Sequence, residues 1–337
     1  MIVTIKDVAK LAECSIKTVS RVVNGEPHVS DLTREKVQAA IDTLGYTPNI
    51  TARRLVKRKS FMIGILMHAA GHYQSEVLSR VMDMAYQLDY DILLQTYYPS
   101  HERSREKLRS LINEKRVDGL VTTPPCDVDP YLSDLLFNAD TPYVQISPLN
   151  RDPAVPYVTG DDYQGAYLMT ERLIMMGHWR IAFLSGPRNH CMSIDRLFGY
   201  KAALETYRIP VQDEFILDSL YNFDGGYNAT RMAMALAEAP TAIFAGSDEA
   251  ALGALFALRE MGMAVPQQVS VCGFDNLPHS SRVWPGLSTV NHPIDQIVGK
   301  AVEMLLTMLA GNELPVRQVV YPCQLEMRGS VGAPPVA

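Results

Sequence analysis

The spacing of apolar side chains divides the chain into two regions with different periods. In the first region the pattern is helical. Val8, Leu11 and Ala12 follow an i, i+3, i+4 stripe. Thr4 precedes this stripe, and Asp7 lies three residues later, which is the spacing of a capping box. The pattern predicts a short helix that begins after Thr4 and buries its apolar stripe.

Two further short helices are expected in the same region. Ser15 can cap a helix over Ile16–Val23 that Gly25 would end. Ser30 can cap a third helix, which stops at Gly45 and carries the apolar stripe Val37, Ala40, Ile41 and Leu44. Three short helices with a tight turn between the first two predict a helix-turn-helix domain.

From Phe61 the pattern changes, because short apolar runs alternate with helical stretches. The runs are Met62–Met67, Ile92–Leu94, Gly119–Val121, Tyr143–Ile146, Ile181–Leu184, Ala242–Ala245 and Val269–Phe274. Helices are expected between them at Val77–Leu88, Arg103–Lys115, Leu197–Tyr207, Tyr227–Glu238 and Ala250–Met261. The alternation predicts doubly wound parallel sheets, with too many units for one sheet. The expected fold class is α/β, with a small all-α headpiece and a two-lobed core.

The charge distribution separates the same two regions. The whole chain carries a net charge of −6. Residues 1–60 hold eleven Lys or Arg against six Asp or Glu, a net charge of +5, whereas the remainder has a net charge of −11. A basic headpiece on an acidic body suggests that one module faces DNA and the other faces away from it.

One segment carries the most specific signal. It contains DVAKLA from Asp7, SIKTVSRVVNG from Ser15, TREKV from Thr33 and LGYTPN from Leu44. With these spacings the chain resembles the LacI/GalR (lactose and galactose repressor) family of bacterial transcription regulators, through to about Ser330. The resemblance implies a DNA-binding repressor with a core like that of periplasmic binding proteins and a small-molecule effector.

In a helix-turn-helix, side chains at the start of the recognition helix meet base edges in the major groove. Ile16, Lys17 and Arg21 fall on that face, where the two cations can donate to guanine and Ile16 can touch a thymine methyl group. Thr18, Ser20 and Asn24 suit phosphate contacts. The residues expected at DNA are Thr4, Ser15, Ile16, Lys17, Thr18, Ser20, Arg21, Asn24, Asn49, Ala52, Arg53 and Leu55.

The last four of these lie in Pro48–Leu55, which matches the hinge helix of the family. In that family, paired hinge helices enter the minor groove and a leucine wedges between base pairs, which implies this role for Leu55. The expected domains are a headpiece over 1–47, a hinge over 48–60, a core over 61–330 and a tail over 331–337. Lobe one covers about 61–161 and 292–320, and lobe two about 162–291 and 321–330.

The core carries the resemblance in Leu184–Pro187, Asp195–Tyr200, Gly246–Gly253 and Val271–Asn276. Family positions carried over to this sequence imply a ligand site between the lobes, formed by His68, Tyr73, Gln145, Arg196, Tyr221, Ser247, Asp275 and His292.

Three of these residues have implied roles. Arg196 and Asp275 would grip ligand hydroxyls, because a guanidinium and a carboxylate suit vicinal diols. Tyr221 would stack on the ligand. Ser247 stands where many relatives carry asparagine. His68 and His292 are equally open to structural roles.

Two further acidic residues of the core have a different expected role. Asp162 and Asp248 are expected to cap helices or stabilise the fold. The segment Gly71–Gln74 gives a polar lobe-one wall, which favours a carbohydrate effector over a purine.

The sequence lacks the motifs of several common enzyme classes. The sequence has no G-x-S-x-G, no G-x-x-x-x-G-K-[ST], no H-E-x-x-H and no dinucleotide-binding glycine pattern after a strand, so neither a catalytic residue nor a cofactor is expected. A purine-responsive regulator stays open. A solute-binding protein on the same fold would need a signal peptide where this chain has a helix-turn-helix.

The remaining expectations concern the setting of the protein. Five scattered cysteines without a C-x-x-C pair predict reduced thiols and no metal site. No apolar run approaches a membrane span, so a cytoplasmic, nucleoid-associated protein without a membrane partner is expected. A homodimer is the expected assembly, because a two-fold protein matches a palindromic operator in double-stranded DNA.

Overall fold

The computed structural model describes residues 3–23, 27–46, 59–68 and 71–335. The chain divides into two compact units, Met1–Ser60 and Phe61–Ala337. Most of the expected hinge, residues 48–58, lies outside the described residues. Among the described residues, none of the helices combines the length and apolar character needed to span a bilayer.

The headpiece contains three helices, α1 (Ile5–Leu11), α2 (Ile16–Val23) and α3 (Asp31–Leu44). Local signals fix their ends. Thr4 and Asp7 form the expected capping box, with the Thr4 backbone N–H donating to the Asp7 carboxylate at 2.9 Å. Ser30 Oγ accepts from the Thr33 N–H at 3.4 Å, and Gly45 ends α3 with a φ of +61°. The core of the unit is Val8, Ala9, Ala12, Val19, Val22, Val37 and Ala40.

The stripe predicted for α1 was wrong at one residue. Leu11 is 51% exposed, and Ala9 is buried in its place. An α-helix turns about 100° per residue. A buried arc that runs from Val8 through Ala12 to Ala9 therefore leaves Leu11 outside it.

The second unit contains two six-stranded sheets, one in each lobe. The lobe-one sheet has the order β11-β5-β4-β3-β1-β2, and the lobe-two sheet has the order β12-β10-β9-β8-β6-β7. Neighbouring strands are parallel except for the antiparallel pair β10 and β12. The strands are β1 (Met62–Met67), β2 (Asp91–Thr96), β3 (Gly119–Thr122), β4 (Tyr143–Ile146), β5 (Tyr157–Gly160), β6 (Ile181–Ser185), β7 (Ile216–Asp218), β8 (Ala242–Ala245), β9 (Ser270–Asp275), β10 (Ser288–Asn291), β11 (Gln318–Tyr321) and β12 (Gln324–Glu326).

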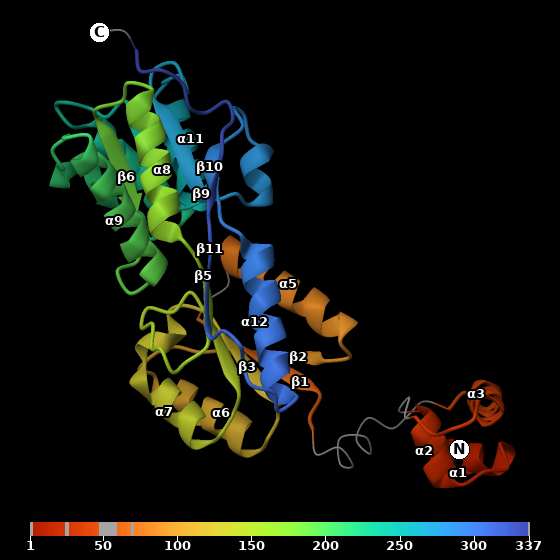
Figure 1. The fold of residues 1–337 in the computed structure, drawn as a ribbon. Coiled ribbons are helices and arrows are strands. Elements are labelled where there is room, and N and C mark those ends of the chain that lie inside the picture. The colour runs from red at the N-terminus through yellow and green to blue at the C-terminus, as the bar shows by residue number, and fades with distance from the viewer. Residues whose placement is uncertain (1–2, 24–26, 47–58, 69–70, 336–337) are drawn as a thin grey trace. The chain divides into compact units, whose positions relative to one another are not determined.

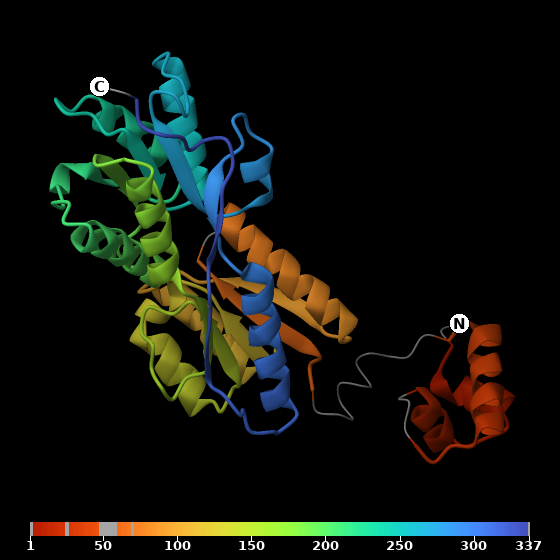
Figure 2. The ribbon, with the colours of Figure 1, turned by 45° about the horizontal axis from the view of Figure 1, so that its top comes forward.

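Helices cover both faces of each sheet, as the predicted α/β class requires (Figure 2). In lobe one, α5 (His72–Gln87) and α12 (Ile294–Leu309) share one face, and α6 (Glu102–Asn113) and α7 (Pro130–Asn138) share the other. In lobe two, α8 (Asp162–Met175) pairs with α9 (Cys191–Thr206), and α10 (Phe223–Met234) pairs with α11 (Asp248–Glu260). Each sheet is therefore the middle layer of three.

The chain crosses between the lobes three times (Figure 1). The crossings run from β5 to α8, from β10 to α12, and from β11 to β12. The segments that follow the carboxyl ends of the parallel strands β1, β6, β7, β8 and β9 meet at the lobe boundary. Such edges are where doubly wound folds bind ligands.

The end of the chain differs from the expected tail. Val331 is buried, and the Gly332 N–H donates to Ser270 Oγ at 3.0 Å. The Gly332 carbonyl oxygen lies 2.9 Å from His178 Nε2. Residues 331 and 332 therefore belong to lobe two, where they complete the pairing of buried polar groups.

Close helix crossing in lobe two gives a stability prediction. A Cβ at Gly199 on α9 would lie 2.1 Å from the Tyr163 carbonyl oxygen of α8. We expect Gly199→Ala to lower the free energy of unfolding by about 1–3 kcal/mol through overpacking, measured by urea denaturation.

The matched control lies on α12. The nearest atom to a Cβ at Gly299 is Met84 Sδ at 3.9 Å. Gly299→Ala should leave stability unchanged or raise it by up to about 1 kcal/mol, because alanine has the higher helix propensity. Equal losses in both variants would contradict the assigned packing.

Candidate DNA-binding face and effector cavity

The second helix of the headpiece has one buried and one exposed face. Val19 and Val22 point into the three-helix core. On the other side, Lys17 is exposed and Ile16 is 46% exposed, although isoleucine is usually buried. Ser15 Oγ accepts from the Thr18 N–H at 3.0 Å, which caps the helix start. The amino end of α2 thus presents an apolar and a cationic side chain to the outside.

The other residues expected at DNA are partly described. Thr4 and Ser15 are exposed cap residues, and Thr18, Ser20 and Arg21 are half-buried. The rest of the expected set lies outside the described residues: Asn24, Asn49, Ala52, Arg53 and Leu55.

A cavity of about 330 Å³ lies between the lobes of the second unit. Five of the eight residues expected at the ligand line it: Tyr73, Arg196, Tyr221, Ser247 and Asp275. The whole predicted lobe-one wall, Gly71–Gln74, also lines it. We call this space the effector cavity.

Two residues that line the effector cavity, Arg196 and Asp275, belong to a buried ion-pair network. Arg196 Nε donates to Asp162 Oδ1 at 2.7 Å, and Nη2 donates to Asp275 Oδ1 at 3.1 Å. Nη1 donates to the Gly246 carbonyl oxygen at 2.5 Å. The guanidinium also lies 3.6 Å from the centre of the Phe274 ring. Arg196 is only 1% exposed, so its charge depends on these partners.

Burial and pairing act in opposite directions on the pKa values of this network. Burial alone would lower the pKa of Arg196, but the carboxylates of Asp275 and Asp162 hold it well above its usual value. Burial would raise the pKa of Asp162, but Arg196 and His292 lower it. For Asp275 burial outweighs the attraction of Arg196, and the pKa is raised.

Asp162 and Asp248 stabilise the fold, as expected, but neither is the helix cap. Asp161 caps α8 by accepting from the Gln164 N–H at 3.0 Å, and Ser247 caps α11 by accepting from the Ala250 N–H at 3.2 Å. Asp162 instead pairs with Arg196. Asp248 accepts from the Leu277 N–H at 2.8 Å and from Thr289 Oγ1 at 2.5 Å, which ties α11 to the segment after β9 and to β10.

Tyr221 and Asp275 hold unusual backbone conformations at the cavity. Their φ angles are +57° and +114°, in a region that residues other than glycine rarely adopt. The Tyr221 ring also needs two glycines beside it, because a Cβ at Gly186 or Gly246 would lie within 2.5 Å of a ring carbon. Strained backbone at a cavity is typical of binding residues that the surrounding fold holds in place.

The structure does not place His68, Gln145 or His292 among the residues that line the effector cavity. Gln145 is buried in β4, and His68 Nδ1 lies 3.3 Å from the Tyr97 carbonyl oxygen. His292 lies in the crossing from β10 to α12, with its Nε2 3.5 Å from Asp162 Oδ2. These contacts favour structural roles for the two histidines.

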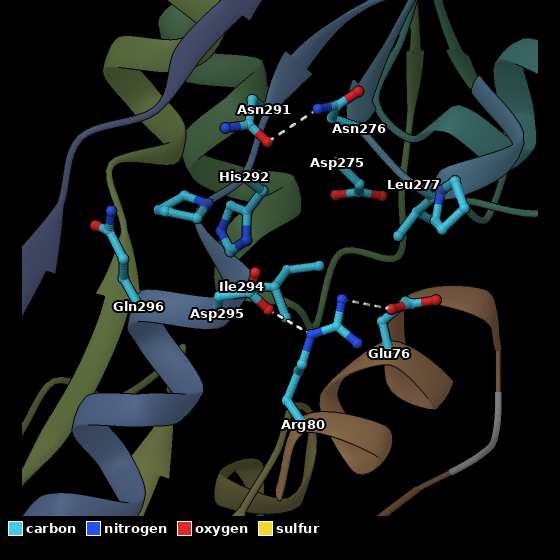
Figure 3. Close-up of a pocket in the computed structure, with 12 residues that line it drawn as sticks. Glu76, Arg80, Asp275, Asn276, Leu277, Asn291, His292, Ile294, Asp295 and Gln296 are labelled. Atoms are coloured by element: carbon cyan, nitrogen blue, oxygen red, sulfur yellow. Dashed lines mark hydrogen bonds and ion pairs between the residues drawn. The ribbon is translucent and has the colours of Figure 1, made fainter. Parts of the chain in front are cut away.

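His292 lines a neighbouring hollow of about 260 Å³ (Figure 3). The hollow shares Asp275 and Leu277 with the effector cavity. Arg80 of α5 reaches across it to Asp295, and its Nη2 lies 3.3 Å from Glu76. This hollow lies where the crossing from β10 to α12 passes between the lobes.

Sequence reasoning missed several residues of the effector cavity. Glu249, from the first turn of α11, lies with Oε2 2.8 Å from His72 Nδ1 of the other lobe. His190 is the residue before α9, and burial lowers its pKa to about 4. Apolar walls come from Pro187, Met192, Leu220 and Leu277. Glu249 lies in the motif Gly246–Gly253, but neither the motif nor the strand pattern shows which of these side chains face the cavity.

A headpiece with an outward-facing recognition helix, carried in one chain with a ligand-sized cavity between two lobes, defines the class of effector-controlled transcription regulators. The sequence comparisons agree with this class. Residues 4–49 match bacterial regulatory proteins of the lacI family, and residues 170–331 match a periplasmic binding protein-like domain.

Whole-chain relatives extend the match. Catabolite control protein A of Priestia megaterium is 33% identical over 335 residues, which cover 98% of this chain and 99% of that protein. The ribose operon repressor of Haemophilus influenzae is 32% identical, over 97% of this chain and 98% of that protein. The HTH-type transcriptional repressor PurR of Vibrio atlanticus is 34% identical, over 92% and 93%.

Solved structures show the same architecture. The lac repressor dimer bound to operator and the anti-inducer ONPF matches with a TM-score of 0.84 and 29% identity, over 99% of this chain and 100% of that one. The complex of the regulator CelR with cellobiose matches with a TM-score of 0.74 and 29% identity, over 97% and 99%. The chain belongs to the LacI family, and it is a DNA-binding transcription regulator, not an enzyme.

Proposed function

We propose that this protein represses carbohydrate-utilisation genes and that a sugar in the effector cavity controls its binding to DNA. The observation that carries the proposal is the effector cavity itself, where the Arg196–Asp275 pair and the Tyr221 ring lie together. Sugars present many hydroxyls and a weakly apolar face, so they need polar groups and an aromatic surface. Among the relatives, the regulator CelR is bound to cellobiose.

A purine is the second candidate effector. PurR of Vibrio atlanticus is 34% identical to this chain, which is as similar as the repressor named for ribose. Overall identity therefore does not separate the two ligand classes. The polar wall of Gly71–Gln74 favours the sugar.

In this proposal the exposed face of α2 reads the operator. Lys17 and Arg21 donate to guanine, Ile16 contacts a thymine methyl group, and the small polar residues hold phosphates. Leu55 acts from the hinge as a wedge in the minor groove. The protein acts on chromosomal DNA in the cytoplasm, at the nucleoid.

The assembly we propose is a homodimer formed through an apolar groove on lobe two. Trp284 is 97% exposed there and Phe256 is 47% exposed, in a hollow of about 710 Å³ that also includes Phe223 and Leu255. Exposed apolar surface of this kind is typical of protein interfaces. A second copy is the occupant that fits, because a two-fold operator needs a two-fold protein. The related lac repressor was solved as a dimer.

The DNA-reading role predicts two different failures. Lys17→Ala should relax base preference at one or two operator positions by roughly 1–3 kcal/mol each, because one cation that meets base edges is removed. Leu55→Ala should lose specific affinity, because the apolar wedge is removed. It should retain weak non-specific binding, because the charge of the protein is unchanged. Gel shifts with an operator library at several salt concentrations would measure both effects.

The control for Lys17 is Lys36→Ala, which removes an exposed cation from α3. It should affect all sequences equally or not at all. Identical behaviour of Lys17→Ala and Lys36→Ala would remove the proposed role of α2.

The dimer proposal predicts that Trp284→Asp shifts the protein toward monomer in sedimentation equilibrium, because a charge would be buried unpaired in the interface. Operator binding, measured at the same total protein concentration, should weaken as the dimer is lost. Trp179→Asp is the control, since Trp179 is 61% exposed on lobe two outside the groove. A fully dimeric Trp284→Asp protein would show that the interface lies elsewhere.

The effector site predicts that Asp275→Ala lowers sugar affinity by about 1–3 kcal/mol or more, because Arg196 loses a buried partner. Operator binding should persist, since the headpiece is a separate unit. Calorimetry against a sugar and nucleobase panel measures the first effect, with the exposed Asp213→Ala as control. If a purine binds tightly and no sugar binds, the effector is a purine and not a sugar.

A further inference from the structure

The cationic side chain of the effector cavity is already paired with two carboxylates of the protein. Of the Lys and Arg residues in the described part of the chain, Arg196 alone lines the cavity. Each guanidinium nitrogen already has a protein partner: Nε has Asp162, Nη1 has the Gly246 carbonyl oxygen and Nη2 has Asp275. Two carboxylates thus share the charge of one guanidinium, and Asp275 is the one of the two that lines the cavity.

A further acid, Glu249, adds a carboxylate to the lining of the cavity. Glu249 lines the cavity from α11, with its side chain 23% exposed. Its contact is His72, which lies across the lobe boundary with its side chain 64% exposed to solvent. His190 supplies no positive charge near neutral pH, because burial lowers its pKa to about 4.

The amino ends of helices contribute positive charge to the cavity, which opposes the effect of the carboxylates. The residues that precede α9, α10 and α11 line the cavity, namely His190, Asn222 and Ser247. Each end carries a partial positive charge of roughly half a unit. The amino ends of α10 and α11 are already capped, because Asn222 accepts from the Gly225 N–H and Ser247 accepts from the Ala250 N–H. Acidic residues also occupy the first turn of each helix, Asp224 in α10 and Asp248 and Glu249 in α11. The His190 side chain makes no capping hydrogen bond to α9, so backbone N–H groups at the start of this helix can donate to the oxygens of ligand hydroxyls.

We propose that the effector cavity takes an uncharged glycoside and excludes its acidic counterparts, with Glu249 as the residue that enforces this choice. The inference rests on the proposed sugar effector and narrows it to one class. Asp275 and Glu249 accept hydrogen bonds from ligand hydroxyls, and a ligand carboxylate or phosphate would meet like charge without an available cation. Like charges brought together in a site strongly disfavour the wrong ligand.

The experiment compares matched pairs of ligands on the full chain by calorimetry and thermal shift. The pairs are methyl glucoside with methyl glucuronide, galactose with galacturonate, and uracil with orotate. Wherever a pair binds, the neutral member should bind at least about tenfold more tightly than the anionic member. An anionic member that binds as tightly as its neutral partner would overturn the proposal.

Two variants separate charge from lobe contact. Glu249→Gln removes the carboxylate charge, whereas His72→Gln removes the imidazole that contacts Glu249 across the lobe boundary and leaves the carboxylate in place. The ratio of neutral to anionic affinity should fall severalfold in Glu249→Gln only. An unchanged ratio in Glu249→Gln, or an equal fall in both variants, would remove the role of Glu249. The exposed Glu238→Gln controls for net charge.

The outcomes distinguish this proposal from the one it rests on. If the neutral nucleobase binds and no sugar does, the sugar effector is wrong and the charge selection stands. If a sugar pair binds without discrimination, the sugar effector stands and the charge selection is wrong. A panel in which no member binds contradicts both.

Discussion

Lobe two depends on one buried cation. The guanidinium of Arg196 is held by carboxylates from the start of α8 and the end of β9, and by a carbonyl oxygen from the end of β8. Removing a charge from water is costly, and only complete pairing compensates for it. The network therefore fixes three segments relative to one another. It also fixes the cavity wall that those segments form.

The same network reaches the segments that join the lobes. Asp162 directly follows the crossing from β5, and His292 lies in the crossing from β10 to α12, with 3.5 Å between Nε2 and Oδ2. Asp275 belongs to the network and lines the effector cavity. A ligand that engages Asp275 thus acts on groups beside two of the three crossings. Differential binding to two lobe arrangements is what an effector needs to change DNA affinity.

Local signals predicted the elements that have clear ends and a long apolar pattern. Helix α2 was placed at its correct bounds because Ser15 caps its start. Strands β1, β4 and β8 were also placed correctly, since each is a short apolar run that is mostly or fully buried. The edge strands β7, β11 and β12 were missed, because each is only three or four residues long and half exposed.

The effector cavity was predictable where a motif carried it. Arg196, Tyr221 and Asp275 came from family positions, and all three line the cavity. Glu249 and His190 could not be predicted, because their place depends on how the two lobes face each other. Gln145 failed for the opposite reason: the strand position was correct, but its side chain is buried away from the cavity.

The three crossings also set the order in which the protein can be made. Lobe one needs α12, whose residues Val298, Val302 and Leu305 fill its core, and its edge strand β11 comes only at Gln318–Tyr321. Lobe two needs β12 and the buried Val331. Domains usually fold as units during synthesis, the amino-terminal one first. Here residues up to Tyr321 must be synthesised before lobe one can close its core, and residues up to Val331 before lobe two can. The two lobes therefore complete their cores at nearly the same point of synthesis.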